Sequence, residues 1–115
     1  MVEYQWHIFW VNLDPAKGSE QSAARPVLVV SSEQMNQSLP IVGVISLTSF
    51  KENRKIYPAE CFLSKSETGL DRDSIAMAHQ IRVISKERLG RDCGFISSQA
   101  LREKIKIALK KYLDI

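Results

Sequence analysis

The sequence predicts a mainly β protein, a small and partly closed β-barrel followed by a C-terminal α-helix. The chain has 115 residues, which is enough for one domain with a modest core. Residues 1–85 contain several short apolar runs separated by turn signals, as expected of a barrel. Residues 97–114 instead have the apolar spacing of an amphipathic helix. We therefore expect a single domain over residues 1–115.

The expected strands are rich in β-branched and aromatic residues, and they lie at residues 6–13, 26–31, 41–47, 57–63, 74–78 and 81–84. The first ends at Asp14-Pro15, and the second begins at Pro26, the position in a strand that tolerates proline. The run from Pro26 is continuously apolar, which is typical of a strand buried on both faces. Gly43 in the third strand suggests a bulge or a close backbone approach. Unpaired edge strands would remain, and a second copy of the chain could cover them.

Three segments are expected to be helical. Residues 33–38 and 85–89 each have room for about one helical turn, the second ended by Gly90. Gln99 to Leu113 forms a longer helix that Ser97 or Ser98 can cap. Its apolar face consists of Leu101, Ile105, Ala108, Leu109 and Tyr112. Ile107 falls on the opposite, lysine-rich face, where it is either a singly exposed apolar residue or a partner contact.

The composition and the short motifs of the sequence limit the functional classes to which the protein can belong. The net charge of +3 permits a nucleic-acid or acidic partner without requiring one. The two cysteines do not form a CxxC pair and no HxxxH spacing occurs, so we expect no metal site. No signal peptide or membrane span is predicted, which favours a cytoplasmic protein. The phosphate-binding GxxxxGK[ST] and GxGxxG motifs and the GxSxG hydrolase motif do not occur.

The first candidate site is the polar segment that precedes the second expected strand. It contains Lys17, Ser19, Glu20 and Gln21 and ends at Arg25. Because Pro26 follows, the backbone of Arg25 is held in extended geometry, and its guanidinium can offer a rigid fork of donors to a phosphate. Considered alone, the segment is better explained as a solvated loop with a salt-bridged arginine.

Two further candidates are Thr48 and His79. Thr48 follows the third expected strand and begins a basic loop that contains Phe50, Lys51, Arg54 and Lys55, so its hydroxyl could hold a phosphate oxygen while the loop binds RNA. Its simpler role is to satisfy the last backbone group of its strand. His79 lies between two apolar segments and could take and give a proton, or be a structural histidine with one satisfied nitrogen.

Three segments, taken together, resemble the MazF/PemK (Kid) toxins of type II toxin–antitoxin modules. They are WVNLDPAKGSEQSAARPVLVVS from Trp10, VISLTS from Val44 and TGLDRDSIAMAHQIRVIS from Thr68. The resemblance implies an SH3-like barrel with a C-terminal helix, usually a homodimer. It implies a sequence-specific endoribonuclease that needs no metal or other cofactor and cuts single-stranded RNA, such as mRNA, by attack of the 2′-hydroxyl. The products are a 2′,3′-cyclic phosphate and a 5′-hydroxyl, and the consequence is inhibition of translation and growth.

The resemblance also implies site residues and a protein partner. The family's catalytic arginine falls on Arg25 and its threonine on Thr48, and Glu20 matches the glutamate near the site. Ser19 and Gln21 belong to the loop that covers the RNA, and Gln80 lies in the QIR motif beside it. A cognate antitoxin, through an acidic and apolar C-terminal segment, is expected to occupy the RNA groove.

Two positions depart from the family pattern. Trp6-His7 stands where members usually have Gly-Asp or Gly-Glu, and His79 replaces an acid before the glutamine. We therefore expect Glu20 or His79 to handle protons, with the division between acid and base open. The departures motivate an alternative, a non-catalytic RNA- or antitoxin-binding relative with the same fold. A gyrase-inhibiting toxin of the CcdB type is less well supported, because its Trp-Gly-Ile ending is absent from Leu113-Asp114-Ile115.

Overall fold

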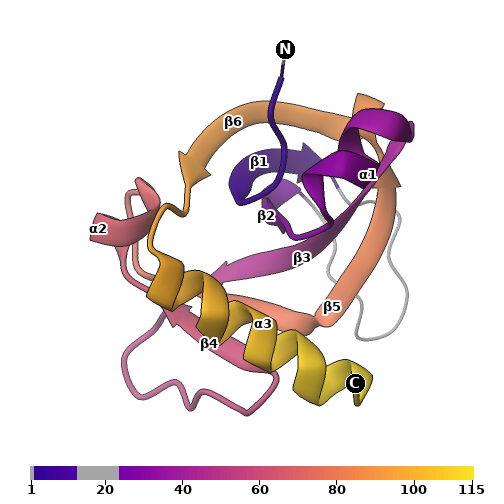
Figure 1. Ribbon diagram of the computed structural model, residues 1–115. Coiled ribbons are helices and arrows are strands. Elements are labelled where there is room, and N and C mark those ends of the chain that lie inside the picture. The colour runs from indigo at the N-terminus through magenta and orange to yellow at the C-terminus, as the bar shows by residue number, and fades with distance from the viewer. Residues whose placement is uncertain (1, 13–23) are drawn as a thin grey trace.

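The computed structural model describes residues 2–12 and 24–115, and within them the fold is mainly β, as predicted. One six-stranded antiparallel sheet has the order β4-β5-β3-β2-β1-β6 and curls around a core, with β4 and β6 at its edges (Figure 1). The strands are β1 His7–Asn12, β2 Ala24–Val29, β3 Ile41–Ser49, β4 Glu60–Leu63, β5 Ser74–Ser85 and β6 Leu89–Phe95. The sheet is an open barrel, since β4 and β6 do not pair with each other in the described part.

The helical elements are α1 Glu33–Ser38, α2 Lys65–Thr68, the 3₁₀ turn η1 Lys86–Arg88 and α3 Gln99–Leu113. The predictions for α1 and α3 are confirmed. The turn expected at residues 85–89 is η1, but it ends at Arg88, and Gly90, expected to end it, lies in β6. Helix α2 was not expected. Ser98 caps α3 by accepting a hydrogen bond from the Leu101 amide at 3.1 Å. Gly69 ends α2 with a φ of 83°, in the left-handed region that favours glycine.

The two strands expected at 74–78 and 81–84 are a single strand, β5. Its pairing with β3 shifts register between Val44 and Ser46, which face Arg82 and Met77. The residues between Met77 and Arg82, which include His79, therefore lie in a bulge. The polar residues there interrupt the apolar pattern, but a bulge bends a strand without ending it.

Strand β6 was not predicted from the sequence. It is an edge strand that pairs only with β1 in the described residues, and its charged and glycine-rich sequence, LGRDCGF, lacks an apolar period. Both of its glycines permit close approaches. A Cβ atom at Gly90 would lie 2.6 Å from the Trp10 carbonyl oxygen, and one at Gly94 would lie 2.6 Å from that of Thr68. Gly43 is less crowded: its amide donates to the Ser31 hydroxyl, and the β3 register shift lies beyond it.

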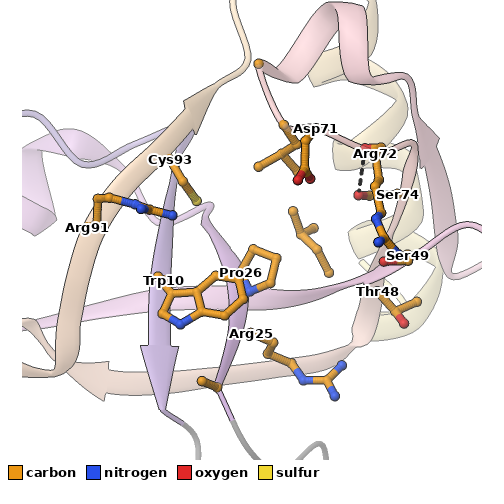
Figure 2. A pocket seen from close by; sticks show the side chains of 14 residues that line it. Trp10, Arg25, Pro26, Thr48, Ser49, Asp71, Arg72, Ser74, Arg91 and Cys93 are labelled. Carbon is orange, nitrogen blue, oxygen red and sulfur yellow. Dashed lines mark hydrogen bonds between the residues drawn. The ribbon is translucent and has the colours of Figure 1, made fainter.

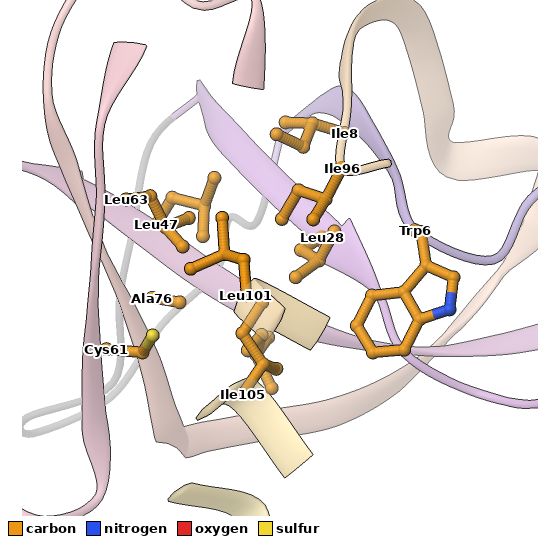
Figure 3. Close-up of a cluster of buried hydrophobic side chains, with 11 residues drawn as sticks. Trp6, Ile8, Leu28, Leu47, Cys61, Leu63, Ala76, Ile96, Leu101 and Ile105 are labelled. Atoms are coloured by element: carbon orange, nitrogen blue, oxygen red, sulfur yellow. The ribbon is translucent and has the colours of Figure 1, made fainter. Parts of the chain in front are cut away.

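One of the two buried hydrophobic clusters lies between the curled sheet and α3. Leu101 and Ile105 on α3 contact a buried cluster from the sheet that includes Ile8, Leu28 and Leu47 (Figure 3). Ala108 is also buried, and Leu109 packs against the cluster. Tyr112, expected on this face, is 49% exposed because it lies in the last turn of α3, beyond the sheet contact. Ile107 is exposed, as predicted for its lysine-rich face. The expectation for β2 is confirmed, since Val27, Leu28 and Val29 are fully buried.

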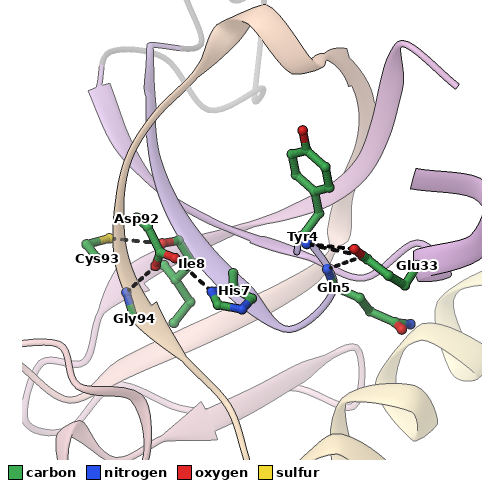
Figure 4. Close-up of polar contacts among 8 residues, drawn as sticks. All are labelled: Tyr4, Gln5, His7, Ile8, Glu33, Asp92, Cys93 and Gly94. Atoms are coloured by element: carbon green, nitrogen blue, oxygen red, sulfur yellow. Dashed lines mark hydrogen bonds and ion pairs between the residues drawn. The ribbon is translucent and has the colours of Figure 1, made fainter. Parts of the chain in front are cut away.

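The N-terminal segment is held against the barrel by Glu33 of α1. The Glu33 carboxylate accepts hydrogen bonds from the backbone amides of Tyr4 at 3.1 Å and Gln5 at 2.8 Å (Figure 4). Burial raises the pKa of Glu33, but these bonds and those from Gln37 and Asn36 outweigh it, so the pKa lies below its ordinary value. This contact fixes the start of β1, the strand that carries Trp10.

Candidate functional site

A pocket of about 680 Å³ opens at one end of the sheet, and it contains both Arg25 and Thr48 (Figure 2). Its walls come from β1, β2, β3, β5, β6 and the loop before β5. The side chains around it are Trp10, Ala24, Arg25, Pro26, Leu47, Thr48, Ser49, Gly69, Leu70, Asp71, Arg72, Ser74, Arg91 and Cys93. Two residues that are 23 positions apart in the sequence thus meet at one site, because β2 and β3 are antiparallel neighbours.

Arg25 lies at the start of β2, where it pairs with Val11 of β1 and precedes Pro26. Its side chain is half-buried, and its Nε atom is buried without a hydrogen-bond partner in the described part of the protein. An unsatisfied buried donor costs about 1–3 kcal/mol, and donors of a guanidinium are well matched to phosphate oxygens. The arrangement is suited to an anionic ligand.

Thr48 lies near the end of β3, opposite Ile75 of β5. The apolar residues before it are buried, so its half-buried side chain is held on a rigid strand at the pocket wall. Ser49 and Ser74 line the same wall. Hydroxyl groups at this position can donate hydrogen bonds to phosphate oxygens.

Several residues of the pocket were not predicted from the sequence. Arg72 and Arg91 add positive charge to that of Arg25, while Asp71 is the acidic residue of the lining, so the pocket is cationic. Trp10 is 44% exposed. Arg91 carried no detectable signal because β6 has no clear strand pattern, whereas Asp71 and Arg72 fall in a connection that reads as an ordinary polar turn.

A second polar cluster includes two residues predicted for the site, Arg54 and His79. The buried carboxylate of Glu60, at the start of β4, is 2.8 Å from an Arg54 nitrogen and 3.2 Å from Nε2 of His79. It also accepts a hydrogen bond from the Tyr57 amide at 3.0 Å. We call Arg54, Tyr57, Glu60 and His79 the Glu60 cluster. None of the four lines the pocket that contains Arg25 and Thr48.

The Glu60 cluster keeps its carboxylate charged. Burial raises the pKa of Glu60, but the hydrogen bonds from Arg54 and Tyr57 and the charges of Arg54 and His79 together hold it below its ordinary value of 4.5. The bond to Glu60 raises the pKa of Arg54. Within the described residues, these groups mainly form hydrogen bonds and ion pairs with one another.

The other predicted binding residues are distributed around these two regions. Phe50 packs edge-on against Phe62, with 5.1 Å between ring centroids, and the Lys55 ammonium lies 5.3 Å from the Tyr57 ring. Phe50, Lys51, Lys55 and Gln80 do not line the pocket. Lys17, Ser19, Glu20 and Gln21 lie outside the described residues.

The two cysteines are free thiols, and burial raises the pKa of both Cys61 and Cys93. Within residues 2–12 and 24–115, no group of three or more His, Cys, Asp and Glu side chains is arranged to hold a metal ion. No helix in the same ranges is long and apolar enough to cross a membrane.

Comparison with known proteins identifies the family. The family described as PemK-like, MazF-like toxin of type II toxin–antitoxin system matches residues 4–113. This chain belongs to that family. Endoribonuclease MazF9 of Mycobacterium tuberculosis is 41% identical over 111 residues, which are 94% of this chain and 93% of that protein. Endoribonuclease MazF of Staphylococcus saprophyticus is 32% identical over 96 residues, which are 84% and 79% of the two chains.

Solved structures confirm the fold of this family member. A mycobacterial endoribonuclease in complex with its cognate antitoxin has a TM-score of 0.79 at 22% identity, covering 99% of this chain and 97% of that one. MazF from Deinococcus radiodurans has the same TM-score and identity, covering 100% and 99%. The predicted barrel with its C-terminal helix is thus the fold of the MazF-like toxins.

Proposed function

We propose that this protein is the toxin of a toxin–antitoxin module and acts as a metal-independent, sequence-specific endoribonuclease on single-stranded RNA, including mRNA. Family membership and the two relatives named endoribonucleases support this activity. The observation that carries it is the cationic pocket lined by both Arg25, whose buried Nε has no hydrogen-bond partner within residues 2–12 and 24–115, and Thr48. Cleavage of mRNA would inhibit translation and growth.

The proposed reaction is a transesterification within the RNA. The 2′-oxygen attacks the neighbouring phosphorus as its proton is removed, and the bond from phosphorus to the 5′-oxygen breaks as that oxygen gains a proton. A 2′,3′-cyclic phosphate and a 5′-hydroxyl result. Arg25 stabilises the charge that develops on the phosphoryl oxygens, because it stays protonated and its donors are fixed in a fork. Thr48 positions one of those oxygens through a hydrogen bond.

Glu20 and His79 are the proposed groups for the two proton transfers. Both assignments come from the sequence: Glu20 lies outside the described residues, and His79 contacts Glu60 instead of lining the pocket. Separate Glu20→Gln and His79→Gln variants divide these roles through their pH–rate profiles. If the His79 imidazole carries a proton step, the His79→Gln variant loses one limb of the profile. An unchanged profile would exclude His79 from the proton steps.

The proposal includes two protein partners and a cytoplasmic location. We propose that the toxin forms a homodimer and that the acidic, apolar C-terminal segment of a cognate antitoxin blocks the RNA groove. The antitoxin complex of the mycobacterial structural neighbour supports such a partner. The cationic lining of the pocket is complementary to an acidic segment as well as to RNA.

The decisive experiment incubates the purified protein with a long single-stranded RNA in the presence of EDTA. We expect scission at a short recurring sequence, with cyclic phosphate and 5′-hydroxyl ends identified by end-mapping. The Arg25→Ala variant, checked for folding by its thermal melt, controls for a contaminating nuclease. RNA binding without scission by the wild-type protein would instead favour the non-catalytic relative.

A further inference from the structure

Arg91 is a pocket residue that the proposed chemistry does not use. It extends from β6 toward the side of the pocket where Trp10 lies, while Arg25 and Thr48 lie farther along the pocket (Figure 2). Its side chain is exposed and has no hydrogen bond or ion pair within residues 2–12 and 24–115. Arg54 and Arg102, by contrast, bond to Glu60 and to the Ile96 carbonyl.

The neighbouring carboxylate is held away from Arg91. Asp92 accepts a bond from Nδ1 of His7 at 2.8 Å and another from the Gly94 amide at 3.3 Å (Figure 4). Together with Phe95, these residues line a separate hollow that does not include Arg91. Asp92, the acid next to Arg91 in the sequence, therefore bonds to other groups, and Asp71 is the acid that lines the pocket together with Arg91.

The backbone fixes Arg91 beside an aromatic surface. Gly90 approaches the Trp10 backbone so closely that a Cβ atom there would lie 2.6 Å from the Trp10 carbonyl oxygen. Trp10 sits on β1, between β6 and β2, and pairs with Pro26. The exposed indole and the Pro26 ring give this side of the pocket a flat apolar character, next to a guanidinium that has no partner among the described residues.

Such a combination is suited to a nucleobase rather than to a phosphate. A base that stacks on an indole leaves its edge free for hydrogen bonding, and single-stranded RNA exposes both the face and the edge. The arginine fork matches two adjacent acceptors, and among the bases guanine presents these as O6 and N7. Arg25 and Thr48 already provide donors for the scissile phosphate at the other side of the pocket.

We propose that Arg91 is a specificity-determining residue that reads a guanine stacked on Trp10, next to the cleaved phosphate. This inference rests on the proposed endoribonuclease function. It assigns sequence preference to a residue of β6, and the chemistry itself to residues of β2 and β3. Arg91→Lys retains the charge that a phosphate needs but replaces the planar fork with a single ammonium, which holds the two guanine acceptors less rigidly, whereas Arg91→Ala removes both.

The test cleaves a long RNA of mixed sequence with the wild-type protein, Arg91→Lys and Arg91→Ala, and maps all ends. Arg102→Lys, the same change at an arginine on α3 outside the pocket, is the matched control, and thermal melts verify folding. We expect wild-type cuts to have guanine at one fixed position. Both Arg91 variants should lose that preference by about 5- to 100-fold, as for a bidentate base contact. Arg102→Lys should keep the wild-type preference.

Each alternative result has a distinct meaning. A uniform loss of cleavage in Arg91→Ala that Arg91→Lys restores would show a phosphate contact and overturn the base-reading role. Unchanged cleavage combined with weaker inhibition by the antitoxin would assign Arg91 to the protein partner and also overturn it. Failure of the wild-type protein to cut RNA would overturn the endoribonuclease proposal, and with it this one. A variant that melts early is replaced by Arg91→Gln, judged by the same preference.

Discussion

The pocket and the Glu60 cluster use arginine in opposite ways. In the Glu60 cluster, Arg54 contacts a buried carboxylate at 2.8 Å, and His79 contacts the same carboxylate. In the pocket, the buried Nε of Arg25 has no partner among the described residues, and the side chain lies among hydroxyl groups and further arginines. The Glu60 cluster pairs its charges within the protein, whereas the pocket leaves hydrogen-bond donors available to a ligand.

This difference separates stability from ligand binding. Groups that satisfy each other contribute to the folded state and lose that contribution when one is removed. An unpaired guanidinium contributes little to folding but can bind an anion with preorganised donors. Substitutions in the pocket should therefore alter RNA cleavage, and substitution of Glu60 should alter the melt.

Arg25→Ala is expected to have the largest effect. Removal of the donors that stabilise the phosphoryl charge should lower the cleavage rate by about 10²–10³-fold. The free energy of unfolding should not fall, because the buried Nε of Arg25 has no hydrogen-bond partner to lose among the described residues. Cleavage of a defined RNA and thermal denaturation measure the two effects. Arg25→Lys, which retains charge without the fork, should be intermediate. Near-wild-type cleavage by Arg25→Ala would refute the assignment.

Thr48→Val tests the hydroxyl on the neighbouring strand. The replacement keeps the branched shape at the end of β3 and removes the hydrogen bond that we propose the Thr48 hydroxyl makes to a charged phosphate oxygen. Such bonds are worth about 1.5–3 kcal/mol, so we expect the single-turnover cleavage rate to fall by about 10- to 100-fold. Thr48→Ser keeps the hydroxyl and is the matched control. Equal losses in both variants would mean that strand packing, and not the hydroxyl, matters at this position.

The elements that could be predicted from the sequence are those with a strong local pattern of apolar residues. The buried strand after Pro26 and the helix Gln99–Leu113 have strong apolar signals, and both are confirmed. The long strand β5 was divided incorrectly because His79 falls in a bulge, where polar residues replace the apolar alternation. Strand β6 was missed because an edge strand needs few apolar residues and its glycines serve close packing against β1 and Thr68.

The site was predicted in part for the same physical reasons. Arg25 precedes one strongly apolar segment and Thr48 follows another, so their positions at strand ends could be inferred. The partners of Arg54 and His79 could not, because Glu60 reaches them only through the packing of β4 on β5. Arg91 lies on β6. Because this strand was not predicted from the sequence, the position of Arg91 in the pocket could not be predicted either.

Glu60→Gln should have the largest effect on stability among the polar substitutions considered. The amide cannot replace the charge-assisted bonds to Arg54 and His79, so we expect a loss of about 1–3 kcal/mol in the free energy of unfolding. The lowered pKa of Glu60 also means that its stabilisation is present at neutral pH and is lost as the pH falls below 4.5 through the folded-state pKa. The variant should therefore show a smaller loss of stability between pH 5 and about pH 3 than the wild-type protein. Parallel acid-induced losses would contradict this.

His79→Gln should have the smallest effect on stability, because glutamine can still donate to Glu60 and Arg54 keeps its contact with the same carboxylate. We expect a change of less than about 1 kcal/mol at pH 7 in urea denaturation. A double-mutant cycle with Glu60→Gln then measures the coupling between the two side chains without reference to cleavage. A loss as large as that of Glu60→Gln would show that the imidazole, and not the arginine, is the main partner of the buried carboxylate. His79 would then be the residue that mainly determines the stability of the Glu60 cluster.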